Sequence, residues 1–182
     1  VFLAPASQAK GDVQESAPML IVGIEGMRDF YPMLVAENLG KQGVRARAGF
    51  VPWAAVAAQT DRNNVQLADG LEDAAQRSTL AHALKALVRP GERIGLPAIL
   101  GMSAHNSVIA DLEAATGAEI FEIPTLPPSV PGTRLHQALQ RFLAATGVRI
   151  ESNMEVVGFG AEDGAQGRRI GWVETSTSAR PL

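Results

Sequence analysis

The chain has 182 residues and a formal net charge of −3, with 46% hydrophobic and 19% charged residues. These values are typical of a globular protein with one domain and a sizeable core. Because the net charge is slightly negative and lysine and arginine form no cluster, a nucleic-acid-binding surface is not expected. The sequence has no cysteine, which excludes disulfides, thiolate metal ligands and a cysteine nucleophile. No apolar run approaches the roughly 20 residues of a membrane span.

The N-terminal segment, residues 1–17, is small and polar in composition and is predicted to be a flexible arm. From residue 18 onwards, continuous apolar runs alternate with amphipathic segments, which is typical of buried parallel strands joined by helices. Asp29 and Ser103 are predicted to cap two of the helices, and Pro97 is expected to place its strand at a sheet edge or in a bulge. The expected strands are residues 19–24, 44–51, 94–100 and 118–123, and the expected helices are residues 29–41, 71–88, 133–145 and one that ends at Gly117.

This alternation predicts the fold class. We expect an α/β domain over residues 18–146, built as a three-layer, mainly parallel Rossmann-like sheet with flanking helices. The period changes in the last segment, residues 147–182, where residues 148–150 are expected as a short strand. Two longer strands, residues 154–159 and 169–175, are predicted to form a C-terminal β-hairpin.

A turn with two glycines, Gly23 and Gly26, follows the first expected strand. The dinucleotide-binding fingerprint needs Gly-x-Gly-x-x-Gly at this point and an acidic residue at the end of the next strand. The first pattern is incomplete, and the next strand ends at Val51 with no acid. We therefore interpret the turn as a tight connection between strand and helix.

A proline-rich connector, residues 123–135, joins the fourth strand to the following helix and contains four prolines. Each proline fixes φ and removes a backbone donor, so the connector is expected to be stiff. Thr133 or Ser129 can cap the helix, and Gly132 permits a turn or a close approach. The helix N-terminus with Arg134 beside it suits an anion. The alternative is a rigid loop that only aims the helix.

Catalytic and metal-binding signatures are sparse. The three histidines, His82, His105 and His136, show no His-x-x-x-His spacing, so no metal site is expected. No Gly-x-Ser-x-Gly elbow is present, and Glu72 with Asp73 is interpreted as a solvated helix start. Residues 60–64 are dense in hydrogen-bonding side chains and predict a solvated turn or a helix cap. One further polar cluster at a strand's carboxyl end, either a ligand site or a surface turn, is Glu25, Arg28 and Asp29.

Three segments together resemble the flavoprotein B subunit of anaerobic glycerol-3-phosphate dehydrogenase. The longest is the connector, where residues 124–135 are PTLPPSVPGTRL. Residues 21–30, IVGIEGMRDF, resemble the strand-turn-helix segment of that family, and residues 62–64, RNN, resemble a short polar motif in its middle. The resemblance extends from about residue 18 to the C-terminus.

The resemblance implies that this chain is an internal domain from which the flavin-binding halves are missing, with the hairpin segment leading back to them. It implies a flavin, FMN or FAD, in the full-length protein, although none is expected to bind tightly to this fragment. It also implies oxidation of glycerol 3-phosphate to dihydroxyacetone phosphate, with electrons passed towards quinone. The partners would be the catalytic A subunit and the iron–sulfur membrane C subunit, at the inner face of the cell membrane. The residues expected to face the cofactor or substrate are Thr125, Ser129, Gly132, Arg134, Arg62 and Asn63.

Two other functions remain open at this point. From its residues alone, the chain also fits a stand-alone α/β ligand-binding module or an interaction domain with no ligand. Flavin absorbance of the full-length protein separates the flavoprotein from both alternatives, and binding of a phosphate ester to the fragment separates those two from each other.

Overall fold

The computed structural model describes residues 6–14, 17–53, 63–164 and 167–177. The chain divides into two compact units, Val1–Gln137 and Ala138–Leu182. The first contains the α/β sheet and the second contains the hairpin, and each is described by itself.

The sheet of the first unit has four parallel strands: β1 (Met19–Ile24), β2 (Ala46–Val51), β3 (Arg93–Pro97) and β4 (Ile120–Ile123). Their order is β2-β1-β3-β4, so β1 and β3 are central. Every residue of these two central strands is buried, which is why their sequences, apart from Arg93 at the start of β3, are apolar without alternation. The expected parallel α/β sheet is therefore confirmed.

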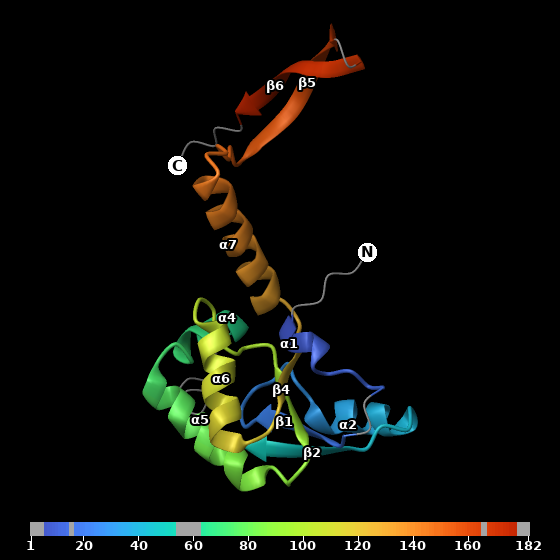
Figure 1. Cartoon of the computed structure of the whole chain (residues 1–182), viewed down its shortest axis with the longest axis vertical. Coiled ribbons are helices and arrows are strands. Elements are labelled where there is room, and N and C mark those ends of the chain that lie inside the picture. Colours follow the sequence, from blue (N-terminus) through green and yellow to red (C-terminus); the bar gives the residue numbers. More distant parts are fainter. Residues whose placement is uncertain (1–5, 15–16, 54–62, 165–166, 178–182) are drawn as a thin grey trace. The chain divides into compact units, whose positions relative to one another are not determined.

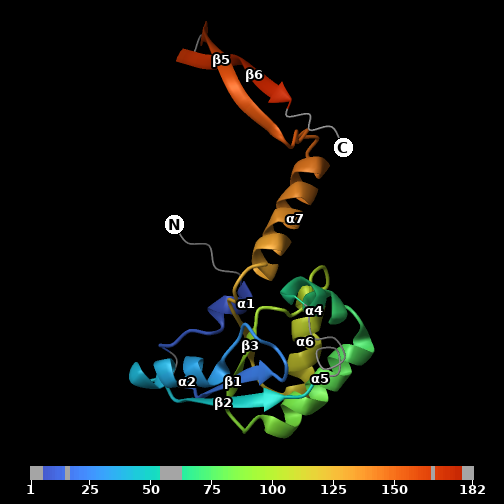
Figure 2. The same cartoon turned by 180° about the vertical axis from the view of Figure 1, so that it is seen from behind.

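Helices cover both faces of this sheet, and the two views agree on their sides (Figure 1, Figure 2). Alternate β1 residues, Leu20, Val22 and Ile24, share a cluster with α5 (Ala74–Leu87) and α6 (His105–Thr116). The intervening residues Met19 and Ile21 share another cluster with α2 (Pro32–Lys41). Because successive strand residues point to opposite faces, this division gives the expected three layers.

The expected starts of the first two helices are wrong. The first helix begins at Pro32 rather than Asp29, and Tyr31 precedes it without a side-chain cap. The helix expected over residues 71–88 is α5, which begins at Ala74 rather than Leu71. A separate helix, α4 (Asn64–Gly70), precedes it. The break has a physical cause: the Asp73 carboxylate accepts the Ala75 and Gln76 amides at 2.8 and 3.0 Å and starts a new helix. The helical turn considered within residues 54–58 lies outside the described residues.

Pro97 does not mark an edge strand, because β3 is central. It is the last residue of β3, and the pairing of β3 with β1 has already ended at Gly95. No ladder bond to β1 is therefore lost at the proline, which explains how a central strand accommodates it.

The described part of the N-terminal segment packs on the sheet. It contains α1 (Ala6–Ala9), and the buried Arg93 donates to the carbonyl oxygens of Lys10 and Asp12 at 2.9 and 3.0 Å. Lys10 also forms an ion pair with Glu113 at 2.6 Å. Within the segment expected as a flexible arm, residues 6–9 are therefore helical, and Lys10 and Asp12 are bound to the α/β unit.

The second unit contains the antiparallel hairpin of β5 (Met154–Gly164) and β6 (Gly167–Thr177). The predicted hairpin is confirmed and is longer than expected. Residues 148–150, expected as a strand, are irregular. Helix α7 (Val130–Ala145) begins in the first unit and ends in the second. Among the described residues, no helix combines the length and apolar character that crossing a membrane requires.

Candidate functional site

The proline-rich connector leads from β4 into α7, which begins at Val130 and not at Thr133 as expected. Ser129 is the cap: its Oγ accepts the Gly132 amide at 3.1 Å, while Thr133 Oγ1 donates to the Ser129 carbonyl at 3.0 Å. Pro131 then lies in the first turn, where its missing N–H costs nothing. The first turn is thus already partly satisfied by the connector itself.

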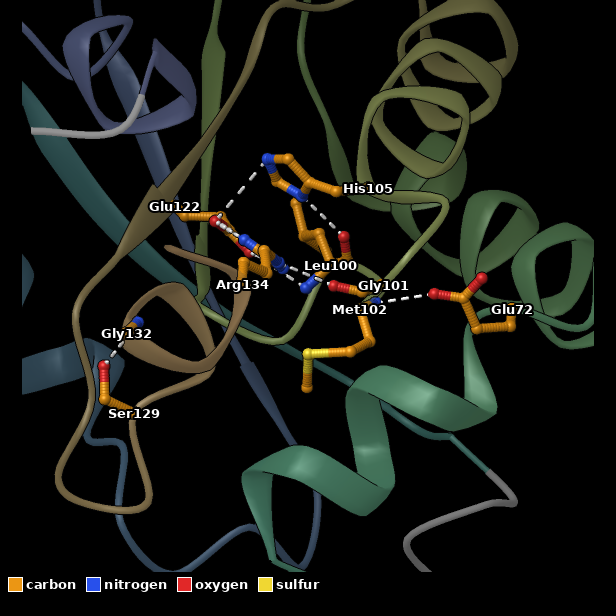
Figure 3. A network of polar contacts seen from close by, with 9 residues as sticks. All are labelled: Glu72, Leu100, Gly101, Met102, His105, Glu122, Ser129, Gly132 and Arg134. Carbon is orange, nitrogen blue, oxygen red and sulfur yellow. Dashed lines mark hydrogen bonds and ion pairs between the residues drawn. The ribbon is translucent and has the colours of Figure 1, made fainter. Parts of the chain in front are cut away.

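Arg134 turns back from α7 onto the end of the sheet (Figure 3). Its two terminal nitrogens donate to the two carboxylate oxygens of Glu122 at 2.7 and 2.9 Å, and its Nε donates to the Gly101 carbonyl at 2.8 Å. The side chains of Glu122 and Arg134 are 0% and 12% exposed. Arg134, which was expected to hold an anion beside the helix N-terminus, is instead bound to Glu122, because a carboxylate inside an apolar strand requires a cationic partner.

Glu122 joins further groups at the carboxyl ends of β3 and β4. Its Oε1 accepts the Leu100 amide at 2.9 Å, and its Oε2 lies 3.9 Å from His105 Nε2. The other ring nitrogen, His105 Nδ1, lies 2.7 Å from the Leu100 carbonyl oxygen. The loop after β3, the start of α6 and the start of α7 are therefore held together around one carboxylate.

A second carboxylate, Glu72, supports the same loop from the other side (Figure 3). It accepts three consecutive amides, those of Met102, Ser103 and Ala104, at 2.6, 2.8 and 3.1 Å. Burial acts to raise the pKa of Glu72, but these three amides and the nearby Arg77 outweigh it, so the pKa lies below its usual value.

Glu72 is thus the cap of α6, and two expectations are wrong. Glu72 is not part of a merely solvated helix start, and Ser103 does not cap α6 with its side chain. The physical reason is that a carboxylate from another part of the chain meets the positive end of the helix more favourably than a neutral hydroxyl.

The polar segment before α4 meets the connector. Asn64 is buried, and its amide nitrogen donates to Thr125 Oγ1 and to the Leu126 carbonyl, both at 3.0 Å. Asn63 is exposed and caps α4 through its side-chain oxygen, which accepts the Gln66 amide at 3.0 Å. Two of the segments that resemble the same family are therefore adjacent in space. Arg62 lies outside the described residues.

The expected site residues that the structure describes are brought to one end of the sheet but have different surroundings. Thr125 is anchored by Asn64, Ser129 and Gly132 lie in the exposed first turn of α7 away from the carboxylate cluster, and Arg134 is turned into the domain (Figure 3). Sequence reasoning missed Glu122, Asn64 and the role of Glu72. One signal was available: an isolated acid within an apolar strand, as in Phe121–Ile123, indicates a buried ion pair.

The Gly23–Gly26 turn does not form a flavin cradle. A Cβ added at Gly23 would lie 2.7 Å from Pro32 Cγ and 3.0 Å from Phe50 Cε1, so the space beside this glycine is filled by the chain's own side chains. No acid follows β2, and Glu25, Arg28 and Asp29 are exposed. Within the described ranges no cluster of three or more histidine, aspartate or glutamate side chains is suited to a metal ion. The Gly23–Gly26 turn therefore does not offer the phosphate-binding cradle that a dinucleotide requires.

Comparison with known proteins defines the class. A family model described as an FAD binding domain matches residues 3–171, and the chain belongs to this family.

Among curated proteins, the chain is similar to the B subunit of anaerobic glycerol-3-phosphate dehydrogenase. It is 38% identical over 128 residues to that of Pectobacterium atrosepticum, covering 68% of this chain and 30% of the relative. It is 34% identical over 155 residues to that of Yersinia enterocolitica, covering 81% and 36%. It is also 34% identical over 165 residues to a probable B subunit of Halobacterium salinarum, covering 84% and 38%. The chain thus spans about a third of the length of these relatives. No solved structure matched it.

Proposed function

We propose that this chain forms the internal α/β domain of a flavoprotein B subunit of anaerobic glycerol-3-phosphate dehydrogenase. The observation that supports the proposal is the identity of 34–38% to three such subunits over 68–84% of the chain. In the longer protein, the reaction would be oxidation of glycerol 3-phosphate to dihydroxyacetone phosphate, with electrons passed towards quinone. The domain limits that we propose are residues 18–146 for the α/β domain and residues 147–182 for the hairpin segment that leads back to the flavin-binding part.

The flavin of the longer protein would be bound mainly outside this chain. Gly23 is packed against Pro32 and Phe50, so the one strand-turn-helix segment that resembles a phosphate-binding turn is closed. The family description favours FAD over FMN as the flavin. The flavin would be the two-electron acceptor for the substrate alcohol. This chain would help to orient the flavin and the substrate and to enclose them.

The surface that would do so is the carboxyl end of the sheet, where open α/β sheets gather ligands. Thr125, Ser129, Gly132, Asn63 and Arg62 would face the substrate or cofactor there. Arg134 would act differently from the first expectation: its guanidinium binds Glu122 and Gly101, so it would position the connector on which Thr125 and Ser129 lie.

Partner subunits are part of the same proposal. The relatives are named as B subunits, which implies a multi-subunit complex. We propose the catalytic A subunit and the iron–sulfur membrane C subunit as the partners, which would hold this protein at the inner face of the cell membrane. The substrate would be a small phosphate ester. No nucleic-acid partner is proposed, in keeping with the net charge of −3.

The test is to express the longer polypeptide with its partner subunits and to measure glycerol-3-phosphate oxidation with an artificial electron acceptor. Asn63→Asp is a sharp probe of the site. Aspartate caps a helix as well as asparagine does, so α4 should remain stable while the amide group is lost. We expect an unchanged melting temperature and about tenfold lower turnover, which corresponds to roughly 1.4 kcal/mol of transition-state stabilisation.

Two control variants accompany this measurement. Thr125→Ser keeps the hydroxyl that accepts from Asn64 and should retain turnover. Thr125→Val removes this hydroxyl and should lower turnover. If Asn63→Asp keeps full turnover, Asn63 is only a helix cap. If the wild-type complex shows no glycerol-3-phosphate-dependent reduction of the acceptor, the proposed function is wrong.

A further inference from the structure

The hairpin of the second unit has one apolar face. The cross-strand pairs Phe159–Val173 and Ala161–Ile170 lie on it, because directly opposed residues of antiparallel strands share a face and residues two apart in one strand return to it. The pair Val156–Thr175 lies on the same face, two residues from Val173 along β6. The large apolar side chains of this face are 40–66% exposed, and they are Met154, Val156, Phe159, Ile170 and Val173.

The opposite face of the hairpin is different in character. Its pairs are Glu155–Ser176, Gly158–Glu174, Gly160–Trp172 and Glu162–Arg169. The Trp172 ring lies over Gly160, where an added Cβ would collide with the indole nitrogen, and it is 56% exposed, so it is one large aromatic side chain on a face that otherwise carries charged and small residues. The hairpin is therefore amphipathic, and its apolar face needs a cover because a two-stranded hairpin alone is only marginally stable in water.

We propose that the apolar face of the hairpin docks onto the part of the longer polypeptide that the relatives contain and this chain does not. This rests on the proposed function, which it deepens by naming the docking surface. The family model described as an FAD binding domain matches residues 3–171, so β5 and the start of β6 belong to the matched region and are expected to pack within the longer polypeptide. The chain covers only 30–38% of the three relatives named above, so they have ample further chain to supply the cover.

A second copy of this chain is the main competing occupant, and the size of the face argues against it. Strands of 11 residues give a face about 36 Å long and about 10 Å wide, roughly 400 Å². A stable interface between separate proteins buries about 800 Å² per partner. A domain of the same polypeptide needs less, because the covalent connection keeps its effective concentration high and avoids most of the entropy lost on association.

The test replaces Phe159, Ile170 and Val173 by threonine. Threonine has high β-propensity, so the hairpin should persist while its face becomes polar. In the 182-residue chain, we expect the wild type to bind a hydrophobic fluorescent dye and the triple variant to lose most of that signal. In the longer polypeptide, we expect little dye binding by the wild type, and a melting temperature that falls by several degrees in the triple variant.

The control variant is Met33→Ser. Met33 has the same exposure as Phe159, 66%, but lies on α2 of the other unit, so its replacement should leave the melting temperature of the longer polypeptide unchanged. The proposal is wrong if the triple variant of the longer polypeptide melts like the wild type. It is also wrong if the 182-residue chain is a dimer at micromolar concentration that the three threonines dissociate, because the cover is then a second copy.

The flavin spectrum distinguishes this result from failure of the proposed function. A longer polypeptide that binds no flavin but melts earlier in the triple variant would contradict the flavoprotein assignment and leave the docking surface in place. A flavin-containing polypeptide whose melting temperature ignores the three substitutions would contradict the docking surface alone.

Discussion

Glu122 and Arg134 form a bidentate ion pair, with nitrogen–oxygen distances of 2.7 and 2.9 Å, between a buried strand and the helix that follows the proline-rich connector. The two residues are separated by 12 positions, and the part of the connector between them is residues 123–133. The pair therefore closes the connector into a loop with fixed ends. The ion pair therefore fixes the geometry of the site. Breaking it is costly, because it leaves a charge in an apolar surrounding.

Replacing Arg134 by alanine should destabilise the first unit by about 3 kcal/mol, because the Glu122 carboxylate loses its guanidinium while it stays buried. Chemical denaturation followed by circular dichroism measures this. Arg141→Ala, an exposed arginine on the same helix, is the matched control and should change stability by less than about 0.5 kcal/mol. A variant at Arg134 as stable as the wild type would show that the pair contributes nothing to the fold.

Glu72 should make stability depend on pH. Its pKa in the folded protein is lowered from the ordinary value of 4.5, so its contribution is complete above that value and is lost as the pH falls through the lower folded-state pKa. Glu72→Gln should flatten this acid limb of the stability profile. Glu92, whose pKa is lowered mainly by a hydrogen bond from Arg47, should leave a residual slope.

At neutral pH, Glu72→Ala should cost about 1–2 kcal/mol, the usual effect of losing a helix cap. Urea titrations between about pH 3 and pH 7 provide both measurements, since this range brackets the ordinary pKa of a glutamate. Glu119→Gln removes an exposed carboxylate and serves as the control. Parallel stability profiles for the wild type and Glu72→Gln would contradict the capping role.

Asn64→Asp should loosen the connector. The substitution keeps the shape but removes the two hydrogen bonds that the amide nitrogen donates to Thr125 and Leu126. The new carboxylate can accept from the Thr125 hydroxyl but is buried next to the Leu126 carbonyl, which can only accept. We expect a loss of about 1–3 kcal/mol, with faster proteolytic cleavage within the connector. Gln66→Ala, which removes one half of the neighbouring capping box, is the control and should leave cleavage there unchanged. Equal cleavage rates in Asn64→Asp and the wild type would mean that Asn64 does not hold the connector.

The purified 182-residue chain should contain no tightly bound flavin, because the space beside Gly23 is filled by Pro32 and Phe50. The visible spectrum after purification tests this, and flavin peaks near one per chain would contradict it. Gly23→Ala adds a direct test of the packing: its Cβ would lie 2.7 Å from Pro32, and overpacking of this kind costs about 1–3 kcal/mol. Gly40→Ala is the control, since a Cβ there meets nothing within 4 Å.

The sheet and the hairpin could be predicted from the sequence, because both follow from local periodicity. Continuous apolar runs marked β1 to β4, and alternation with a polar loop marked β5 and β6. The resemblance to the B-subunit family was also visible in the sequence, through the connector and two shorter segments. Helix boundaries were less well predicted, since Asp73 starts α5 through hydrogen bonds to the Ala75 and Gln76 amides that composition does not reveal.

The roles of the polar residues, in contrast, depend on the tertiary structure. Arg134 and Glu122, Glu72 and the loop after β3, and Asn64 and Thr125 are pairs of groups 12 to 61 positions apart. No periodicity links such distant residues, and they become partners only when the parallel sheet brings the ends of its strands together. The physical reason is desolvation: a charged or amide group buried at that edge must find a partner, and which partner lies within reach is fixed by the fold.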